Sequence, residues 1–227
     1  MKRILTTASA AFLALGTAAS AATFSLVNET AGVIPGTGDF NEVLDQTFSM
    51  SGAAGFFGAS IVLDEAADIE IAAFGFEAGF ENSFTLGGTT ITTGDLSAIS
   101  GNGGEAFAAN PATPLLSFTE TNVAAGVLDF SFLTSGFGGA TVLNSANPDN
   151  SGTAPNFFVS FGQDATTQTV FLFFDDGGAE NDDNHDDLVI SLSVGSGNTV
   201  PNPVPLPATG LLLLGALGGM RMMKRRS

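Results

Sequence analysis

The 227-residue chain contains no cysteine, no tryptophan, no tyrosine and a single histidine, His185. Without cysteine the protein has neither a disulfide nor a thiol nucleophile, and one histidine without cysteine gives no basis for a histidine-based zinc site. The absence of tryptophan and tyrosine counts against a catalytic cleft that stacks sugars on aromatic rings. The 21 phenylalanines supply apolar surface without a polar tip, which suits a hydrophobic core.

Basic side chains are absent from the long middle of the chain. The 6 Lys and Arg lie at the two ends, in residues 2–3 and 221–226, and all 23 Asp and Glu lie between them. No salt bridge to Lys or Arg can therefore form within residues 22–203, and nucleic acid is excluded as a partner because nothing there neutralises phosphates. Repulsion among the acidic side chains opposes folding into a compact domain unless salt screens the charges or cations bind. We therefore expect a salty or calcium-bearing medium.

Residues 1–21 have the three parts of a secretory signal peptide. Lys2 and Arg3 precede an apolar run over residues 4–15, and residues 19–21 read Ala-Ser-Ala, an A-x-A cleavage site. We therefore expect export through the Sec translocon and removal of this segment. A structural N-terminal helix is the alternative.

Residues 204–227 combine a Pro-rich start, an apolar run and a basic end. Pro205 and Pro207 keep the first part out of a helix. As a helix, the apolar run over residues 206–220 would be about 22 Å long, which is shorter than the roughly 30 Å hydrocarbon core of a bilayer. The basic end stays cytoplasmic by the positive-inside rule. This order predicts a transient inner-membrane span before processing, with a plain single-span transmembrane anchor as the alternative.

The tail resembles the VPLPA type of the PEP-CTERM sorting signals. That resemblance implies recognition by an exosortase, a membrane cysteine transpeptidase of Gram-negative bacteria, and delivery to the cell surface or extracellular matrix. A second match overlaps it, since residues 206–210 read LPATG, the sortase pentapeptide of Gram-positive cell-wall anchoring. The apolar run after it is shorter than wall-anchored proteins usually carry, so we favour the exosortase. The match is carried by Val204, Pro205, Leu206, Pro207 and Ala208.

Residues 22–194 alternate short β-like runs with turn-forming clusters of Gly, Asn, Ser and Pro. About ten short strands and no convincing amphipathic helix predict an all-β fold, a single β-sandwich of the jelly-roll kind. A Gly-, Ser-, Asn- and Pro-rich linker, residues 195–203, follows. Residues 51–58 are expected to form a Gly-bounded loop that places two phenylalanines in the core, with a self-association surface as the alternative. The expected strands cover residues 23–27, 59–63, 68–71, 83–86, 89–93, 115–119, 128–132, 157–161, 169–174 and 188–194.

An acidic segment separates the last two expected strands. Residues 170–174 form a continuous apolar run, which predicts a strand covered on both faces, and an alternating strand begins at Leu188. Carboxylates crowd residues 175–187 between them, and hard oxygen ligands at this density predict a calcium site. The segment is not an EF-hand, because Asp187 stands where that loop requires glycine. The predicted ligands are Asp175, Asp176, Asp182, Asn184, Asp186 and Asp187.

The same segment resembles a signature of β-rich bacterial surface proteins. In that signature, the sequence Asp-x-Asp-x-x-Asp-Leu/Val-Val lies between two strands. His185 stands where that signature usually has an aromatic residue, and Asn184 replaces an acid. The resemblance implies calcium binding rather than catalysis. A solvated acidic turn that keeps the protein soluble is the alternative. The matching residues are Asp182, Asn184, Asp187, Leu188 and Val189.

No nucleophile-elbow motif accompanies His185, so the chain is not expected to be an enzyme. We expect a calcium-stabilised structural or adhesive protein of the biofilm or envelope. A calcium-dependent carbohydrate-binding module that contacts extracellular polysaccharide is the main alternative. A carboxylate-dependent glycosidase is the third hypothesis, because the spatial separation of acidic side chains leaves no linear motif.

Overall fold

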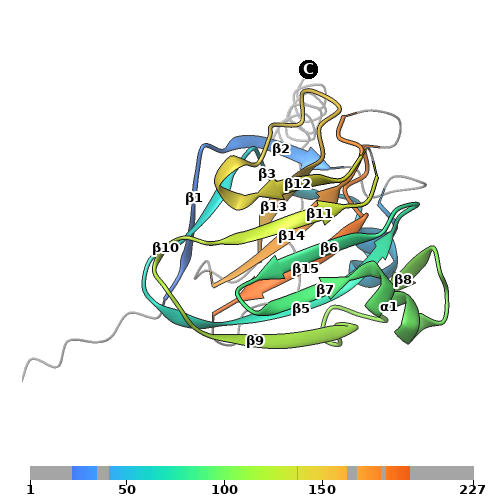
Figure 1. The fold of residues 1–227 in the computed structure, drawn as a ribbon, viewed down its shortest axis with the longest axis horizontal. Coiled ribbons are helices and arrows are strands. Elements are labelled where there is room, and N and C mark those ends of the chain that lie inside the picture. The colour runs from blue at the N-terminus through green and yellow to red at the C-terminus, as the bar shows by residue number, and fades with distance from the viewer. Residues whose placement is uncertain (1–21, 35–40, 137, 163–167, 180–182, 195–227) are drawn as a thin grey trace, which may run out of the picture.

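The computed structural model describes residues 22–34, 41–136, 138–162, 168–179 and 183–194. The described chain is mostly β, and its antiparallel sheets pack as sandwich-like layers (Figure 1), which confirms the all-β sandwich prediction at this level. The expected signal peptide, linker and sorting tail lie outside the described residues. No helix in the described part of the chain is long and apolar enough to cross a membrane.

An eight-stranded sheet forms one layer. Its central strands pair antiparallel without a register shift between β14 and β15, for example Leu172 with Ile190. β9 (Leu116–Val123) pairs with β5 (Ala67–Glu77) on the same side as β8 (Glu105–Phe107). The strands of the main path, in spatial order, are β2 (Thr30–Ile34), β3 (Ala53–Phe57), β13 (Asn156–Phe161), β14 (Thr169–Asp175), β15 (Leu188–Ser193), β5 (Ala67–Glu77) and β8 (Glu105–Phe107).

Two smaller sheets contribute the opposing layer. Asn144 joins segments within it, since its side chain accepts a hydrogen bond from Ile61 N and donates to the Ile61 and Leu128 carbonyl oxygens. The four-stranded sheet has the order β12 (Ala140–Leu143), β11 (Phe130–Thr134), β6 (Asn82–Leu86) and β7 (Thr89–Thr92). The three-stranded sheet has the order β1 (Phe24–Val27), β4 (Ser60–Leu63) and β10 (Gly126–Val127).

Phenylalanines fill the space on both faces of the large sheet. On one face, Phe132 of β11 stacks on Phe174 of β14 with ring centroids 4.7 Å apart. On the other face, Phe48 lies 5.4 Å from Phe171 and belongs to the short π-helical segment η1 (Leu44–Phe48). Every residue of β14 is buried, which confirms that the apolar run is a strand covered on both faces.

The structure also contains elements that the sequence patterns did not predict. The expected loop at residues 51–58 is instead largely β3, so the loop prediction is wrong; Phe57 packs against Phe158 with ring centroids 4.7 Å apart. α1 (Thr93–Ser100) begins with a capping box between Thr92 and Asp95. β2, β8, β10 and β12 are further unpredicted strands, and η2 (Asn144–Ala146) is a short 3-10 turn.

The antiparallel order brings several strand ends to one end of the sandwich (Figure 1). The C-terminal end of β14 lies beside the N-terminal ends of β13 and β15, because both neighbours run antiparallel to it. The C-terminal end of β5 lies beside the start of β15 for the same reason. Acidic residues at these ends are therefore neighbours in space.

Candidate metal centres

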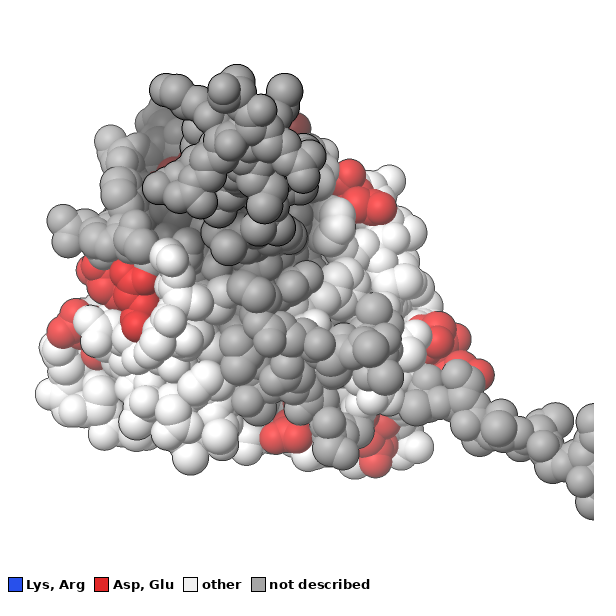
Figure 2. All heavy atoms as spheres, turned by 180° about the vertical axis from the view of Figure 1, so that it is seen from behind, with Lys and Arg blue, Asp and Glu red and all other residues white. Residues whose placement is uncertain are grey.

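Three acidic residues of the segment are buried rather than solvated. Asp175 is 1%, Asp176 7% and Asp186 0% exposed, so the solvated-turn interpretation is wrong for these three residues. The described residues include no Lys or Arg, and Figure 2 shows only acidic charge among the described residues of the rear face. The buried negative charge must therefore be balanced by protons or by bound cations.

Glu42, Glu77 and Asp186 form the first group, which we call the carboxylate cluster. One carboxylate oxygen from each lies within 4.8 Å of the other two. Oδ1 of Asp186 and Oε2 of Glu42 are buried and have no hydrogen-bond partner among the described residues. Buried polar atoms are almost always hydrogen-bonded or bound to an ion, so this arrangement can hold a cation.

Backbone contacts hold the carboxylate cluster together. Glu42 N donates to Asp186 Oδ2 over 2.7 Å, and Glu77 N donates to the Asp186 carbonyl oxygen over 3.0 Å. Asn41 fixes the segment before η1, because its side chain accepts from Leu44 N and donates to the Asn184 carbonyl oxygen. Three segments distant in sequence thus meet at Asp186.

The electrostatics of the carboxylate cluster favour an additional positive charge. Burial, together with the neighbouring charges of Glu42 and Glu77, raises the pKa of Asp186 to about 8, although the hydrogen bond from Glu42 N opposes the rise. A carboxyl group with a raised pKa retains a proton where an exposed one would be ionised. A bound cation can replace that proton.

Asp175, Asp183 and His185 form the second group, the histidine cluster. Nδ1 of His185 lies 3.5 Å from Asp175 Oδ2 and 3.6 Å from Asp183 Oδ1. Asp183 and His185 have positive φ angles of 38° and 61°, an uncommon conformation for residues other than glycine. These left-handed conformations on either side of Asn184 bring the imidazole of His185 close to the Asp183 carboxylate.

Asp176 and Asp187 form a separate pair beside both clusters. Asp176 N donates to Asp187 Oδ2 over 2.7 Å, and Asn82 Nδ2 donates to Asp176 Oδ2 over 2.8 Å. Burial, followed by the charge of Asp176, raises the pKa of Asp187 well above its ordinary value. This pair connects the start of β15 to the start of β6.

The structure does not bring the six predicted ligands together at one site. Asp186 belongs to the carboxylate cluster and Asp175 to the histidine cluster, whereas Asp176, Asn184 and Asp187 belong to neither group. The remaining predicted ligand, Asp182, lies outside the described residues. The cluster residues that the sequence prediction omitted are Glu42, Glu77, Asp183 and His185.

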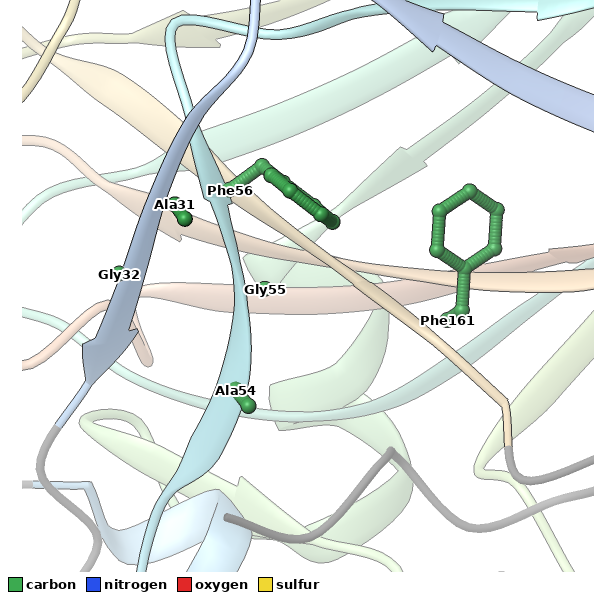
Figure 3. A pocket seen from close by; sticks show the side chains of 6 residues that line it. All are labelled: Ala31, Gly32, Ala54, Gly55, Phe56 and Phe161. Atoms are coloured by element: carbon green, nitrogen blue, oxygen red, sulfur yellow. The ribbon is translucent and has the colours of Figure 1, made fainter. Parts of the chain in front are cut away.

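An apolar hollow of about 220 Å³ lies among β2, β3 and β13 (Figure 3). Gly55 is required there, because a Cβ atom would collide with the Val159 carbonyl oxygen. No side chain in the lining carries an acid, a base or a nucleophile, so the hollow supplies no catalytic group. The lining residues are Ala31, Gly32, Ala54, Gly55, Phe56 and Phe161.

The predicted sorting motif, residues 204–208, lies outside the described residues. Comparisons with protein-family models, with curated proteins and with solved structures found no match to this chain.

Proposed function

We propose that the protein is an exported component of the bacterial cell surface or extracellular matrix, in which calcium bound by the carboxylate cluster stabilises a jelly-roll-like sandwich. The supporting observation is the convergence of Glu42, Glu77 and Asp186 in a domain without Lys or Arg. No described Lys or Arg can neutralise these three carboxylates, so a dication is the natural counter-charge.

The donor set of the carboxylate cluster suits calcium. Calcium takes about 6 to 8 oxygen ligands at about 2.3–2.6 Å, so two oxygens on one ion lie at most about 5 Å apart. The cluster oxygens lie within 4.8 Å of one another and therefore fall inside this limit. Bidentate carboxylates and water would complete the shell, and no nitrogen or sulfur ligand is required.

Calcium at this position would act as a structural clamp. The ion would join the segment before η1, the end of β5 and the loop before β15, and would offset the repulsion among their three carboxylates. Such a clamp would suit a structural or adhesive role in a biofilm or envelope outside the cell. The signal peptide and the VPLPA-type tail support export and sorting by an exosortase at the surface of a Gram-negative bacterium.

The carbohydrate-binding alternative is less well supported. A sugar-binding calcium ion needs coordination positions that a ligand can reach, whereas Asp186 is 0% exposed. The glycosidase hypothesis also lacks support, because the chain has no tryptophan or tyrosine on which a sugar could stack.

Thermal unfolding of the full-length chain tests the calcium proposal. Wild-type protein is compared in millimolar calcium, in magnesium and in chelator, alongside Glu42→Gln and Glu77→Gln. Calcium at about 100 times its dissociation constant adds about 2.7 kcal/mol, or a shift of about 5–11 °C for a domain of this size. Both variants are expected to lose most of the shift.

Asp129→Asn is the matched control, because Asp129 is an exposed acid that belongs to neither cluster. It should keep the wild-type response to calcium. Equal effects of calcium and magnesium, or a full calcium shift in Glu42→Gln, would contradict the proposed clamp.

A further inference from the structure

The imidazole of His185 has a buried nitrogen without a hydrogen-bond partner. His185 is 0% exposed, and its Nδ1 atom makes no hydrogen bond within the described chain. The carboxylate oxygens nearest to it, at 3.5 and 3.6 Å, lie beyond the usual N–H···O range of about 2.7–3.2 Å. This nitrogen faces the middle of the histidine cluster.

A chain of amide hydrogen bonds fixes the tautomer of His185. Asp183 Oδ1 accepts from Asn150 Nδ2 over 2.7 Å, so the Asn150 oxygen faces Asn156 and accepts from its Nδ2 over 3.1 Å. The oxygen of Asn156 then faces His185 Nε2 at 2.9 Å, and the imidazole nitrogen must be the donor. The neutral ring therefore carries its hydrogen on Nε2, which leaves the Nδ1 lone pair pointing toward two carboxylates.

Protonation does not readily fill this position. His185 is fully buried, and burial disfavours the charged form of an imidazole. A lone pair and two carboxylate oxygens then converge, all within 4.8 Å of one another. Three electron-rich atoms in such an arrangement repel one another unless a cation lies between them.

We propose that Asp175, Asp183 and His185 bind a first-row transition-metal dication of the zinc type, at a site separate from the proposed calcium clamp. Ligands about 2.0–2.2 Å from a tetrahedral zinc ion are about 3.3–3.6 Å from one another, and the observed contacts from Nδ1 are 3.5 and 3.6 Å. Imidazole nitrogen selects such metals over calcium, which prefers oxygen alone.

The surroundings of the histidine cluster hold its ligands in place. Asp175 Oδ1 accepts from Gly177 N and Gly178 N, both at 2.7 Å, while Oδ2 faces His185. Gly178 has a φ of 69°, and a Cβ there would lie 2.6 Å from the Ala154 carbonyl oxygen, so only glycine fits. Hydrogen bonds from Asn150 to Asp183 and from His185 Nε2 to Asn156 are the outer contacts that orient metal ligands.

The histidine cluster is also open to an entering ion. The Asp183 side chain is 45% exposed, whereas those of His185 and Asp175 are 0% and 2% exposed. A metal ion can thus enter past Asp183, and water can occupy a fourth coordination position.

Zinc and cobalt(II) titrations of the full-length chain, purified without a histidine tag, test this site. We expect one equivalent to bind, with tetrahedral d–d absorption for cobalt and a shift of the ring nitrogen resonances in NMR spectra. Because the chain has 1 His, every imidazole signal reports on His185. Asp183→Asn keeps an oxygen acceptor for Asn150 and should weaken zinc binding at least tenfold, as should His185→Gln where it folds.

Two control variants separate this site from the calcium clamp. Asp129→Asn should bind zinc as the wild type does, and Glu42→Gln should lose the calcium shift while retaining zinc binding. Unchanged imidazole resonances at saturating zinc, or wild-type zinc affinity in Asp183→Asn, would overturn the assignment. Loss of the calcium shift alone would leave the zinc site standing.

Discussion

Replacing Asp186 with asparagine isolates the charge repulsion within the carboxylate cluster. The amide oxygen of asparagine can accept the hydrogen bond that Glu42 N donates to Asp186 Oδ2, so the main structural contact is preserved. The cluster oxygens lie within 4.8 Å of one another, and two unit charges at that distance repel by about 3.5 kcal/mol at an effective dielectric constant of about 20. Ionised Asp186 faces two such charges.

We therefore expect Asp186→Asn to be more stable than the wild type at pH 9 in chelator, by at least about 3 kcal/mol. For a domain of this size that gain raises the unfolding midpoint by about 6–12 °C. Calcium should reverse the order, because the variant has lost a ligand. Thermal unfolding monitored by circular dichroism measures both effects, and Asp129→Asn provides the control.

The sign of the effect depends on pH. The pKa of Asp186 is raised from 3.8 to about 8, so near pH 4 the wild-type carboxyl is protonated in the folded state and the two proteins should differ little. A variant that is less stable than the wild type at pH 9 in chelator, or that keeps the full calcium shift, would refute this reasoning.

Three further predictions concern pH, the core and a connecting side chain. In chelator, the contribution of Asp186 makes wild-type stability fall as pH rises from about 4 to about 8, because the folded state retains a proton that the unfolded state releases; calcium should flatten this dependence in pH-resolved melts. Phe132→Ala should lower the free energy of unfolding by about 3–5 kcal/mol in denaturant titrations while leaving the calcium shift intact. Asn144→Ala should cost about 2–4 kcal/mol in the same assay, since it removes the side-chain partner of Ile61 N in β4 and of the Leu128 carbonyl oxygen, and a change below about 0.5 kcal/mol would contradict its connecting role.

Regular alternation and long apolar runs made most of the strands predictable. The sequence predicts β14 and β15 within a residue or two of their observed bounds, because β14 contains the continuous apolar run from Val170 to Phe174 and β15 has alternating residues up to Ser193. β3 was missed because its sequence, Ala-Ala-Gly-Phe-Phe, carries no alternation. It is a strand because it pairs with β2 and β13, which is a property of the fold rather than of the local sequence.

The start of helix α1 carries two competing signals in the sequence. Thr92 and Asp95 have the spacing of a capping box, but the threonine-rich stretch before them also favours a strand. Both signals were correct, since β7 ends at Thr92 and α1 begins at Thr93.

The candidate site was only partly predictable, because its ligands are distant in sequence. The density of acids marked Asp175 and Asp186, but Glu42 reaches Asp186 across 144 positions, and nothing around Glu42 distinguishes it from an exposed acid. Burial was equally invisible, since Asp186 follows a polar run that reads as a surface turn. A lone histidine suggests no zinc motif, so nothing in the local sequence indicates that two carboxylates can complete a ligand set around His185.

Calorimetric titration of calcium into the chelator-treated full-length chain tests the central claim most directly. At pH 7 the carboxylate cluster should bind one ion and release a proton from Asp186, so the observed heat should depend on the ionisation enthalpy of the buffer. Glu42→Gln should abolish this binding while Asp129→Asn preserves it. Absence of calcium binding by the wild type, or binding of equal strength in Glu42→Gln, would contradict a calcium clamp at Glu42, Glu77 and Asp186.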